Sequence, residues 1–271
     1  MLIIVLAFFG LACGSFVNAL VWRIHEQGPK SSKELSVMHG RSMCPHCRHE
    51  LAAKDLIPLA SWLILGGRCR YCKKPISAQY PIVELATALV FVTTYIFWPS
   101  DLAQNGEKLL LLTTLLSSTG LMALLVYDLK WMLLPNRIIY PTLLVALVGR
   151  LAYIGFYSNN MALDFVLLIG TLLVTSGLFW LIFEVSKGQW IGFGDVRLGL
   201  ILGCLLAKPS LGMLMIFIAS VLGIAGFVAG SFGKHRSLSQ KIPFGPFLIA
   251  SSWLTVLFGQ KLIDWYLSLL S

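Results

Sequence analysis

Long apolar segments separated by short polar ones make up most of this chain. Each apolar run is continuous and close to 20 residues, the length of a helix that crosses a bilayer. A membrane β-barrel would instead show segments of about ten residues with alternating polarity. We therefore predict an all-α polytopic membrane protein with about eight transmembrane helices. The runs are Leu2–Trp22, Pro81–Trp98, Leu109–Tyr127, Ile138–Tyr157, Leu163–Phe183, Ile191–Ala207, Leu211–Ser231 and Pro243–Leu270.

Three of these runs have unusual features. The fourth contains Arg150, and the sixth is short enough to be partly re-entrant. The first has no basic residue before it, whereas a cleaved signal peptide begins with a basic region. We therefore expect the first run to remain as a transmembrane helix.

Composition and charge add an orientation to this picture. Of the 271 residues, 57% are hydrophobic and only 12% are charged, whereas soluble domains carry about 25% charged residues. If the segment Arg23–Tyr80 is cytoplasmic and the runs alternate, 17 Lys and Arg residues lie on the cytoplasmic side and 4 outside it, as cytoplasmic loops prefer. Both termini are then periplasmic or external. Topology and anionic lipid account for the net charge of +9 without a nucleic-acid partner.

The long polar segment contains two Cys-x-x-Cys pairs separated by 21 residues. Two such pairs, each on a tight turn, can surround Zn²⁺ with four thiolates. Two disulfides are the alternative, but disulfides rarely persist in the cytoplasm. A closed tetrathiolate site is structural, and the neighbouring His46 and His49 are then solvated. The predicted zinc ligands are Cys44, Cys47, Cys69 and Cys72.

Of the twelve acidic residues, Glu84, Asp128 and Asp195 do not have the pattern of solvated loop residues. An ionisable group at membrane depth is costly and is therefore a candidate for function. By the alternation of the runs, Asp128 ends the third at the cytoplasmic level and Asp195 begins the sixth at the same level. Two such carboxyl groups sharing one proton can activate a water, as aspartic proteases do. Gly192 and Gly194 beside Asp195 would let a substrate backbone approach closely.

Other readings of these carboxylates stay open on spacing alone. An Asp at a helix end is often a cap or an interfacial residue, and paired carboxylates also serve as ion relays in transporters. Glu84, in the second run, would line the site, tune the cysteine loop or form a structural ion pair.

Five blocks of the sequence carry a family signature: GSFVNALVWR from Gly14, the cysteine loop from SMCPHC to YPIVE, YDLKWMLLPN from Tyr127, GFGDVRLG from Gly192 and KIPFGPFLIA from Lys241. In this order they resemble the type IV prepilin peptidases. The chain departs from the family pattern after Arg23, where a usual Pro is absent, and at Arg197, where Lys is common.

The resemblance implies a specific activity. Asp128 and Asp195 would be the catalytic pair, supported by Gly192, Gly194, Glu84 and Lys241. The substrate would be a prepilin or pseudopilin, cut after glycine at the cytoplasmic face of a bacterial inner membrane. Members with the cysteine loop also methylate the new N-terminal amine with S-adenosylmethionine. The donor's binding residues and the oligomeric state are open at this stage.

Three functional regions follow from these predictions: a first helix (1–22), a zinc-binding loop (23–80) and a transmembrane peptidase domain (81–271). A different class of function remains as the alternative. The chain would then be a carboxylate-lined ion carrier, or a scaffold of a secretion complex whose zinc loop docks a partner.

Overall fold

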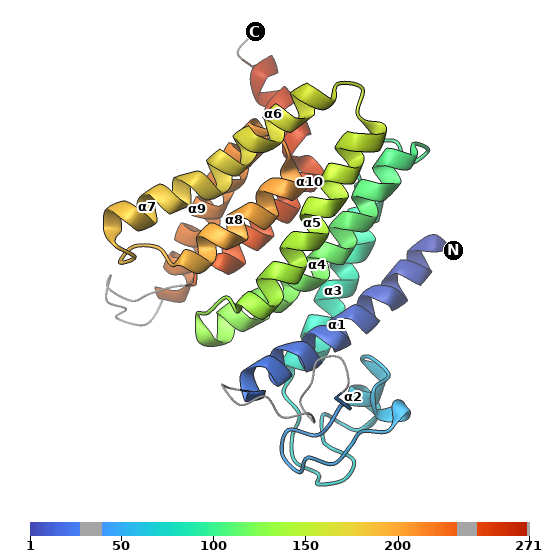
Figure 1. Cartoon of the computed structure of the whole chain (residues 1–271). Helices are drawn as coiled ribbons and strands as arrows, with labels where there is room; N and C mark the ends of the chain where they lie inside the picture. Colours follow the sequence, from blue (N-terminus) through green and yellow to red (C-terminus); the bar gives the residue numbers. More distant parts are fainter. Residues whose placement is uncertain (28–39, 232–242, 270–271) are drawn as a thin grey trace. The chain divides into compact units, whose positions relative to one another are not determined.

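Helices form almost all of the structure, a computed structural model that describes residues 1–27, 40–231 and 243–269 (Figure 1). Lys241 lies outside the described residues. Within the described ranges, the β-structure consists of two isolated bridges in the cysteine loop. The helices are α1 (Leu2–Gln27), α2 (Ala60–Ile64), α3 (Gln79–Ile96), α4 (Asn105–Trp131), α5 (Asn136–Tyr157), α6 (Met161–Leu172), α7 (Leu178–Ser186), α8 (Phe193–Leu206), α9 (Pro209–Ser231) and α10 (Gly245–Ser268), with short helical turns η2 (Ala53–Asp55) and η3 (Leu173–Gly177).

Seven helical segments in the described part of the chain are long and apolar enough to cross a membrane, with α6, η3 and α7 joined into one segment of 26 residues. The sixth predicted run corresponds to α8, which has only 14 residues and is not among these seven. The predicted class, a polytopic helical membrane protein with four cysteines between its first two long helices, is confirmed.

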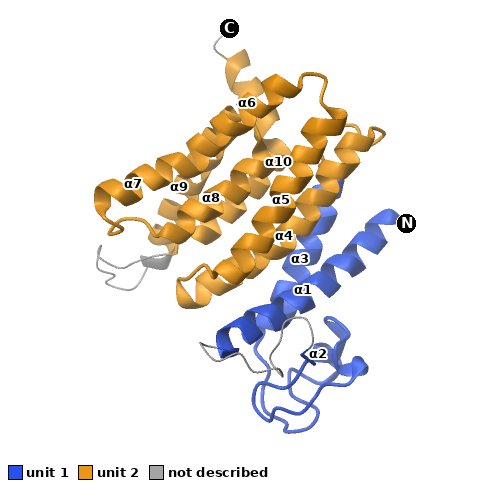
Figure 2. Cartoon of the chain, viewed as in Figure 1, with its two compact units in different colours: residues 1–96 blue, residues 97–271 orange. Residues whose placement is uncertain are grey.

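The chain divides into two compact units, residues 1–96 and residues 97–271 (Figure 2). Unit 1 contains α1, the cysteine loop and α3, and unit 2 contains α4 to α10. The two units are defined by contacts within the chain and not by activity. The three functional regions predicted from the sequence therefore stay a prediction.

Glycines bring the two long helices of unit 1 together. Gly10 and Gly14 lie one turn apart on α1, and a Cβ on either would lie 2.6 Å or less from a backbone Cα of α3, at Ala88 and Glu84 respectively. Small residues four apart are the usual means of close helix packing in membranes. Asn18 strengthens the contact, because its side-chain amide donates to the carbonyl of Tyr80 at 3.0 Å. The C-terminal half of α1 and the first turns of α3 therefore pack closely against each other.

Glycine and threonine interlock α4 and α5 in unit 2. Gly120 of α4 faces the side chain of Thr142 on α5, and Gly149 of α5 faces Thr113 on α4. Neither glycine has room for a Cβ, since each would lie within 2.1 Å of a threonine oxygen. The reciprocal contacts fix the register of these two helices. They thereby fix the position of the α4 C-terminus along α5.

The short helix α8 is held from two sides. In the π-helical turn η3, the Ser176 hydroxyl donates to the carbonyl of Val196 at 2.8 Å. Arg150 of α5 donates to the carbonyls of Cys204 and Leu205 at 2.9 and 2.7 Å, where the last turn of a helix lacks partners of its own. Arg150, which interrupts the fourth apolar run, thus stabilises the C-terminus of α8.

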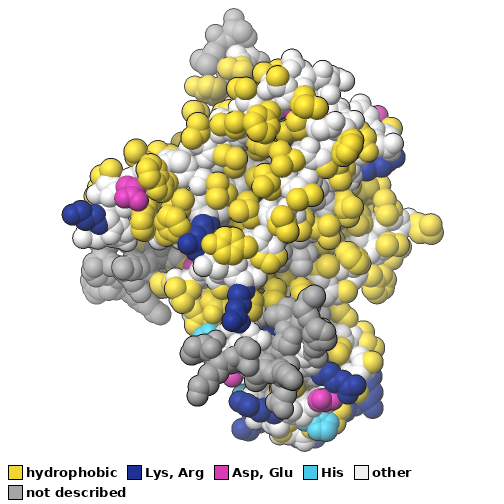
Figure 3. Space-filling model, in the orientation of Figure 1, with side chains coloured by type: hydrophobic (Ala, Val, Ile, Leu, Met, Phe, Trp, Pro, Cys, Tyr) yellow, Lys and Arg dark blue, Asp and Glu magenta, His cyan; other side chains and the backbone are white. Residues whose placement is uncertain are grey.

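The surface of unit 2 is mostly apolar over the face that Figure 3 shows. Large hydrophobic side chains such as Phe156, Val166 and Phe217 are more than 60% exposed. Exposed apolar area on this scale is unfavourable in water and favourable against lipid tails.

Candidate active site and metal centre

Asp128 lies in the last turn of α4 and is buried. The helix ends three residues later, where Met132 adopts a left-handed conformation and its N–H donates to the carbonyl of Asp128 at 2.8 Å. The carboxyl group of Asp128 also accepts a hydrogen bond from the backbone N–H of Gly245, the first residue of α10. The positive end of α10 therefore points at a buried carboxyl group, an arrangement that favours an anion.

Asp195 lies in the first turn of α8, three residues after the N-cap Gly192. Its backbone N–H donates to the carbonyl of Gly192 at 3.1 Å, and its side chain is partly buried. Gly192 itself is exposed. Gly194 has little space for a side chain, because a Cβ there would lie 3.0 Å from Leu134.

The contacts of α8 place Asp195 beside the end of α4 that carries Asp128. Gly194 touches Leu134, and Arg197 of α8 hydrogen-bonds Asn136, which begins α5. Both α4 and α8 pack against α5 and α10. In Figure 1, α4 ends and α8 begins at the same end of unit 2. The carboxyl groups of Asp128 and Asp195 are near enough to interact electrostatically. Residues 67 positions apart in the sequence therefore share one site.

Gly245 is a site residue that the sequence reasoning did not single out. A Cβ at this position would lie 2.6 Å from a carboxylate oxygen of Asp128, so only glycine lets α10 approach that group. The block KIPFGPFLIA contains Gly245 four residues after Lys241, which is outside the described part of the chain.

The two Cys-x-x-Cys segments of unit 1 fold into nearly identical turns. Cys44 accepts backbone hydrogen bonds at its sulfur from residues 46 and 47, and Cys69 accepts them from residues 71 and 72. Each turn closes through a left-handed residue, Arg48 with φ 56° and Lys73 with φ 60°, and a short antiparallel bridge follows each turn. The repeated geometry aims two pairs of sulfurs at one point.

The four sulfur atoms lie within 4.8 Å of one another and can hold a metal ion. Zn–S bonds of about 2.3 Å put tetrahedral sulfurs about 3.8 Å apart, and the Cys44 and Cys72 sulfurs are 3.9 Å apart. Burial raises the pKa of the Cys69 thiol, but the backbone N–H donors and neighbouring thiols outweigh burial and lower that pKa to about 7. Burial raises the pKa of the Cys44 thiol to about 11, so the four sulfurs can hold a metal ion but are not all thiolates in its absence.

Asp55 of η2 stabilises the second Cys-x-x-Cys turn through two hydrogen bonds. Its carboxylate accepts from the Arg70 guanidinium at 2.6 Å and from the Tyr71 hydroxyl at 3.2 Å. Burial opposes ionisation of Asp55, but these two donors more than compensate and hold its pKa below the usual range. The ring of His49 stacks on Tyr71 at 3.7 Å. His46 and His49 are both exposed, as expected for histidines outside the cysteine shell.

Two family models match the chain. The Bacterial Peptidase A24 N-terminal domain matches residues 8–98, and the Type IV leader peptidase family matches residues 115–228. A prepilin leader peptidase/N-methyltransferase of Aeromonas hydrophila is 33% identical, with 96% of this chain and 92% of the relative aligned. The chain belongs to the type IV leader peptidase family. The resemblance seen in the sequence is thereby confirmed.

Two further relatives from this family show how evenly the similarity extends. A prepilin leader peptidase/N-methyltransferase of Pseudomonas aeruginosa is 31% identical over 95% of this chain and 91% of its own. A type 4 prepilin-like proteins leader peptide-processing enzyme of Escherichia coli is 34% identical over 92% of this chain and 93% of its own. No solved structure matches the chain significantly.

For this member of the leader peptidase family, the structure shows where the sequence blocks meet. Parts of three blocks converge in unit 2, through the contacts of Gly194 with Leu134 and of Gly245 with Asp128. The first two blocks meet in unit 1, where Gly14 packs on Glu84. Glu84 is buried, and its carboxylate accepts hydrogen bonds from the Leu59 N–H at 2.8 Å and from the Ser15 side chain. These contacts tie the cysteine loop to α1 and α3.

Proposed function

We propose that this protein is a bifunctional prepilin peptidase that removes the basic leader of a type IV prepilin or pseudopilin and then methylates the new N-terminus. Family membership and relatives that carry both activities in their names support this proposal. The single observation that carries the peptidase half is the convergence of Asp128 and Asp195 at one end of unit 2.

The proposed cleavage uses the two aspartates and one water. One carboxylate takes a proton from the water, whose oxygen attacks the carbonyl carbon of the glycine at the cleavage site. The other carboxyl group, still protonated, gives its proton to the carbonyl oxygen. When the tetrahedral adduct collapses, the C–N bond breaks and the amine leaves with a proton. The leader ends in a glycine carboxylate, and the mature protein begins with a free amine.

The surroundings of the pair suit this chemistry. The N–H of Gly245 holds the Asp128 carboxyl group in place, and the contact of Gly194 with Leu134 holds the first turn of α8. The exposed backbone at Gly192 is the proposed rest for an extended substrate segment, because glycine leaves the backbone polar groups open to a neighbouring strand.

The second proposed activity is methyl transfer from S-adenosylmethionine. The nitrogen of the new amine attacks the methyl carbon, the C–S bond breaks, and its electron pair stays on sulfur. The amine loses one proton to water, and the products are the methylated N-terminus and S-adenosylhomocysteine. The cysteine cluster is proposed to hold Zn²⁺ in a structural role, because four thiolates leave no open position for a reacting water.

The membrane arrangement is proposed from charge. With the cysteine loop in the cytoplasm, both termini are periplasmic in a bacterial inner membrane, and Asp128 and Asp195 lie at the cytoplasmic level. The basic leader of the substrate would be on that side before cleavage.

A mass measurement tests the proposal. The purified protein in detergent is incubated with a model prepilin and S-adenosylmethionine, and the products are weighed. We expect loss of the leader and a gain of one methyl group on the mature peptide. A substrate that stays intact would favour the non-enzymatic alternative, an ion carrier or a docking scaffold.

A further inference from the structure

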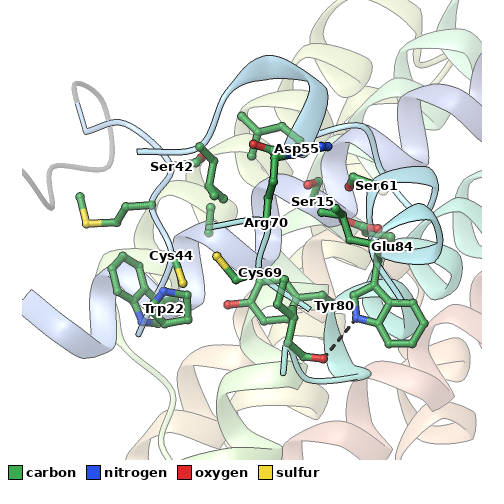
Figure 4. Close-up of a pocket in the computed structure, with 18 of the residues that line it drawn as sticks. Ser15, Trp22, Ser42, Cys44, Asp55, Ser61, Cys69, Arg70, Tyr80 and Glu84 are labelled. Atoms are coloured by element: carbon green, nitrogen blue, oxygen red, sulfur yellow. Dashed lines mark hydrogen bonds and ion pairs between the residues drawn. The ribbon is translucent and has the colours of Figure 1, made fainter. Parts of the chain in front are cut away.

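A cavity in unit 1 lies between α1, the first turns of α3 and the cysteine loop (Figure 4). Its walls are mainly apolar and aromatic, with the indoles of Trp22 and Trp62 and the phenol of Tyr80 among them. The charged side chains that also line it are those of Arg23, Asp55, Arg70 and Glu84. The enclosed part of the cavity is about 130 Å³, and it opens to solvent at its mouth. Apolar and aromatic walls with few polar groups are typical of sites that bind small molecules.

Buried charge distinguishes this cavity. Glu84 reaches its wall from α3, and Ser15 and Ser61 lie beside it in Figure 4. Glu84 as a whole residue is 6% exposed. Its carboxylate accepts hydrogen bonds from the Leu59 N–H and the Ser15 hydroxyl, and neither of these donors is a cation. A buried carboxylate with only neutral donors retains attraction for a positive charge in the cavity.

Two other cavities in the described part of the chain suit a methyl donor less well. One in unit 2 contains Glu107, at the start of α4, whereas Asp128 ends that helix, about 30 Å away by helix length. An amine made at Asp128 would have to cross the membrane to reach it. Another is a shallow apolar hollow around Trp180 that carries no charged side chain.

We propose that the unit 1 cavity binds S-adenosylmethionine, with the carboxylate of Glu84 facing the positively charged sulfonium and the aromatic walls contacting the adenosine. Aromatic faces attract cations and stack on flat rings, so the indoles serve both ends of this ligand. The methionine chain of the ligand, which does not fit inside, would extend through the open mouth. The role of Glu84 is then binding of the methyl donor rather than support of the aspartates.

The proposed charge contact has a specific signature. S-adenosylhomocysteine has nearly the same shape as S-adenosylmethionine, but its sulfur is neutral. Replacing Glu84 by Gln keeps the size of the side chain and one acceptor oxygen for the Leu59 N–H, and it removes the charge. We therefore expect E84Q to weaken binding of S-adenosylmethionine by about tenfold, which is typical for loss of a charge-assisted contact. Binding of S-adenosylhomocysteine should change by about twofold or less.

The test is equilibrium binding of both ligands to the full-length protein with its metal, measured by calorimetry in detergent. A second variant, Ala19→Phe, places a ring in the cavity from α1 and should weaken both ligands. Glu107→Gln, a matched change in unit 2 of a residue bound to Trp98, should alter neither. Metal content and unfolding temperature confirm that each variant is folded.

The outcomes separate this proposal from the function on which it rests. If wild type cleaves and methylates but E84Q and A19F bind both ligands normally, the donor binds elsewhere and only the cavity assignment fails. Equal weakening of both ligands by E84Q would refute the charge contact and make Glu84 a packing residue. A wild-type protein that neither binds S-adenosylmethionine nor transfers a methyl group would remove the methyltransferase half of the proposed function, and this assignment with it.

Discussion

The cysteine loop of unit 1 and the aspartate pair of unit 2 are built in opposite ways. Each half of the cysteine cluster is local, because two cysteines three residues apart share one turn whose backbone N–H groups hydrogen-bond the sulfur. The aspartate pair is assembled from residues 67 positions apart, on helix ends that only packing brings together. A local site can be recognised from spacing, whereas a site built from distant helices requires the topology of the whole unit.

The comparison extends to function. We assign cleavage to the aspartate pair of unit 2 and binding of the methyl donor to the cavity of unit 1. Substitutions in one unit should therefore impair one activity and leave the other intact, which tests the division. The expected effects follow from the largest to the smallest.

Removing either carboxylate of the proposed catalytic pair should have the largest effect. Asp128→Asn and Asp195→Asn keep the size of the side chain but remove the group that shuttles a proton. We expect each to lower kcat/KM for leader removal by about a thousandfold or more. Mass spectrometry of a model prepilin gives the rates. Normal cleavage by either variant would remove that residue from the mechanism.

Loss of one cysteine ligand should act on unit 1 alone. Cys44→Ser replaces a buried thiolate of the cluster, and we expect metal affinity to fall by about a hundredfold and the loop to become sensitive to protease. Metal analysis and limited proteolysis measure both. Cys204→Ala, a change at a buried cysteine of α8, should retain the metal. Full metal content in Cys44→Ser would contradict the four-thiolate site.

Gly245→Ala tests the close approach of α10 to Asp128. The added methyl group must displace the carboxyl group, and a shift of about 1 Å at a reacting group can cost up to about a hundredfold in rate. We expect slower leader removal with unchanged metal content. Gly155→Ala on α5 is the control, because a Cβ there meets nothing within 4 Å. Equal rates for the two variants would show that Asp128 tolerates the displacement.

Asp55→Asn should have the smallest effect. It leaves Arg70 without its anionic partner beside the second Cys-x-x-Cys turn, at a position where Arg70 is 37% exposed and water can compensate in part. We expect unfolding of the loop to become easier by about 1–2 kcal/mol, with the metal still bound. Protection of the loop against hydrogen exchange measures the change. Loss of metal would instead show that the contact of Asp55 with Arg70 is required for the cluster.

The sequence predicted the parts of this molecule that depend on composition and spacing. Apolar runs predicted the membrane helices, and cysteine spacing predicted the cluster, because both signals lie within one element or one turn. The sixth run, Ile191–Ala207, is short in the sequence, and in the structure it forms the 14-residue helix α8. Whether it is re-entrant stays a prediction.

The spacing of residues in the sequence did not predict the contacts between different helices and loops. Nothing local shows that Gly245 lies on Asp128, that Arg150 holds the end of α8, or that Glu84 binds the backbone of Leu59. Arg150 was regarded as an irregularity in an apolar run, although a buried guanidinium can satisfy the last carbonyls of a helix. Such roles depend on which helix faces which, and hydropathy does not encode that.

One variant assayed on two peptides tests the division most directly. Asp195→Asn is given an uncut prepilin and, separately, the mature peptide with its free N-terminus, each with S-adenosylmethionine. We expect no leader to be released from the first peptide and one methyl group to be added to the second at close to the wild-type rate. Loss of methyl transfer to the mature peptide, in a folded protein that retains its metal, would contradict the separation of the two chemistries.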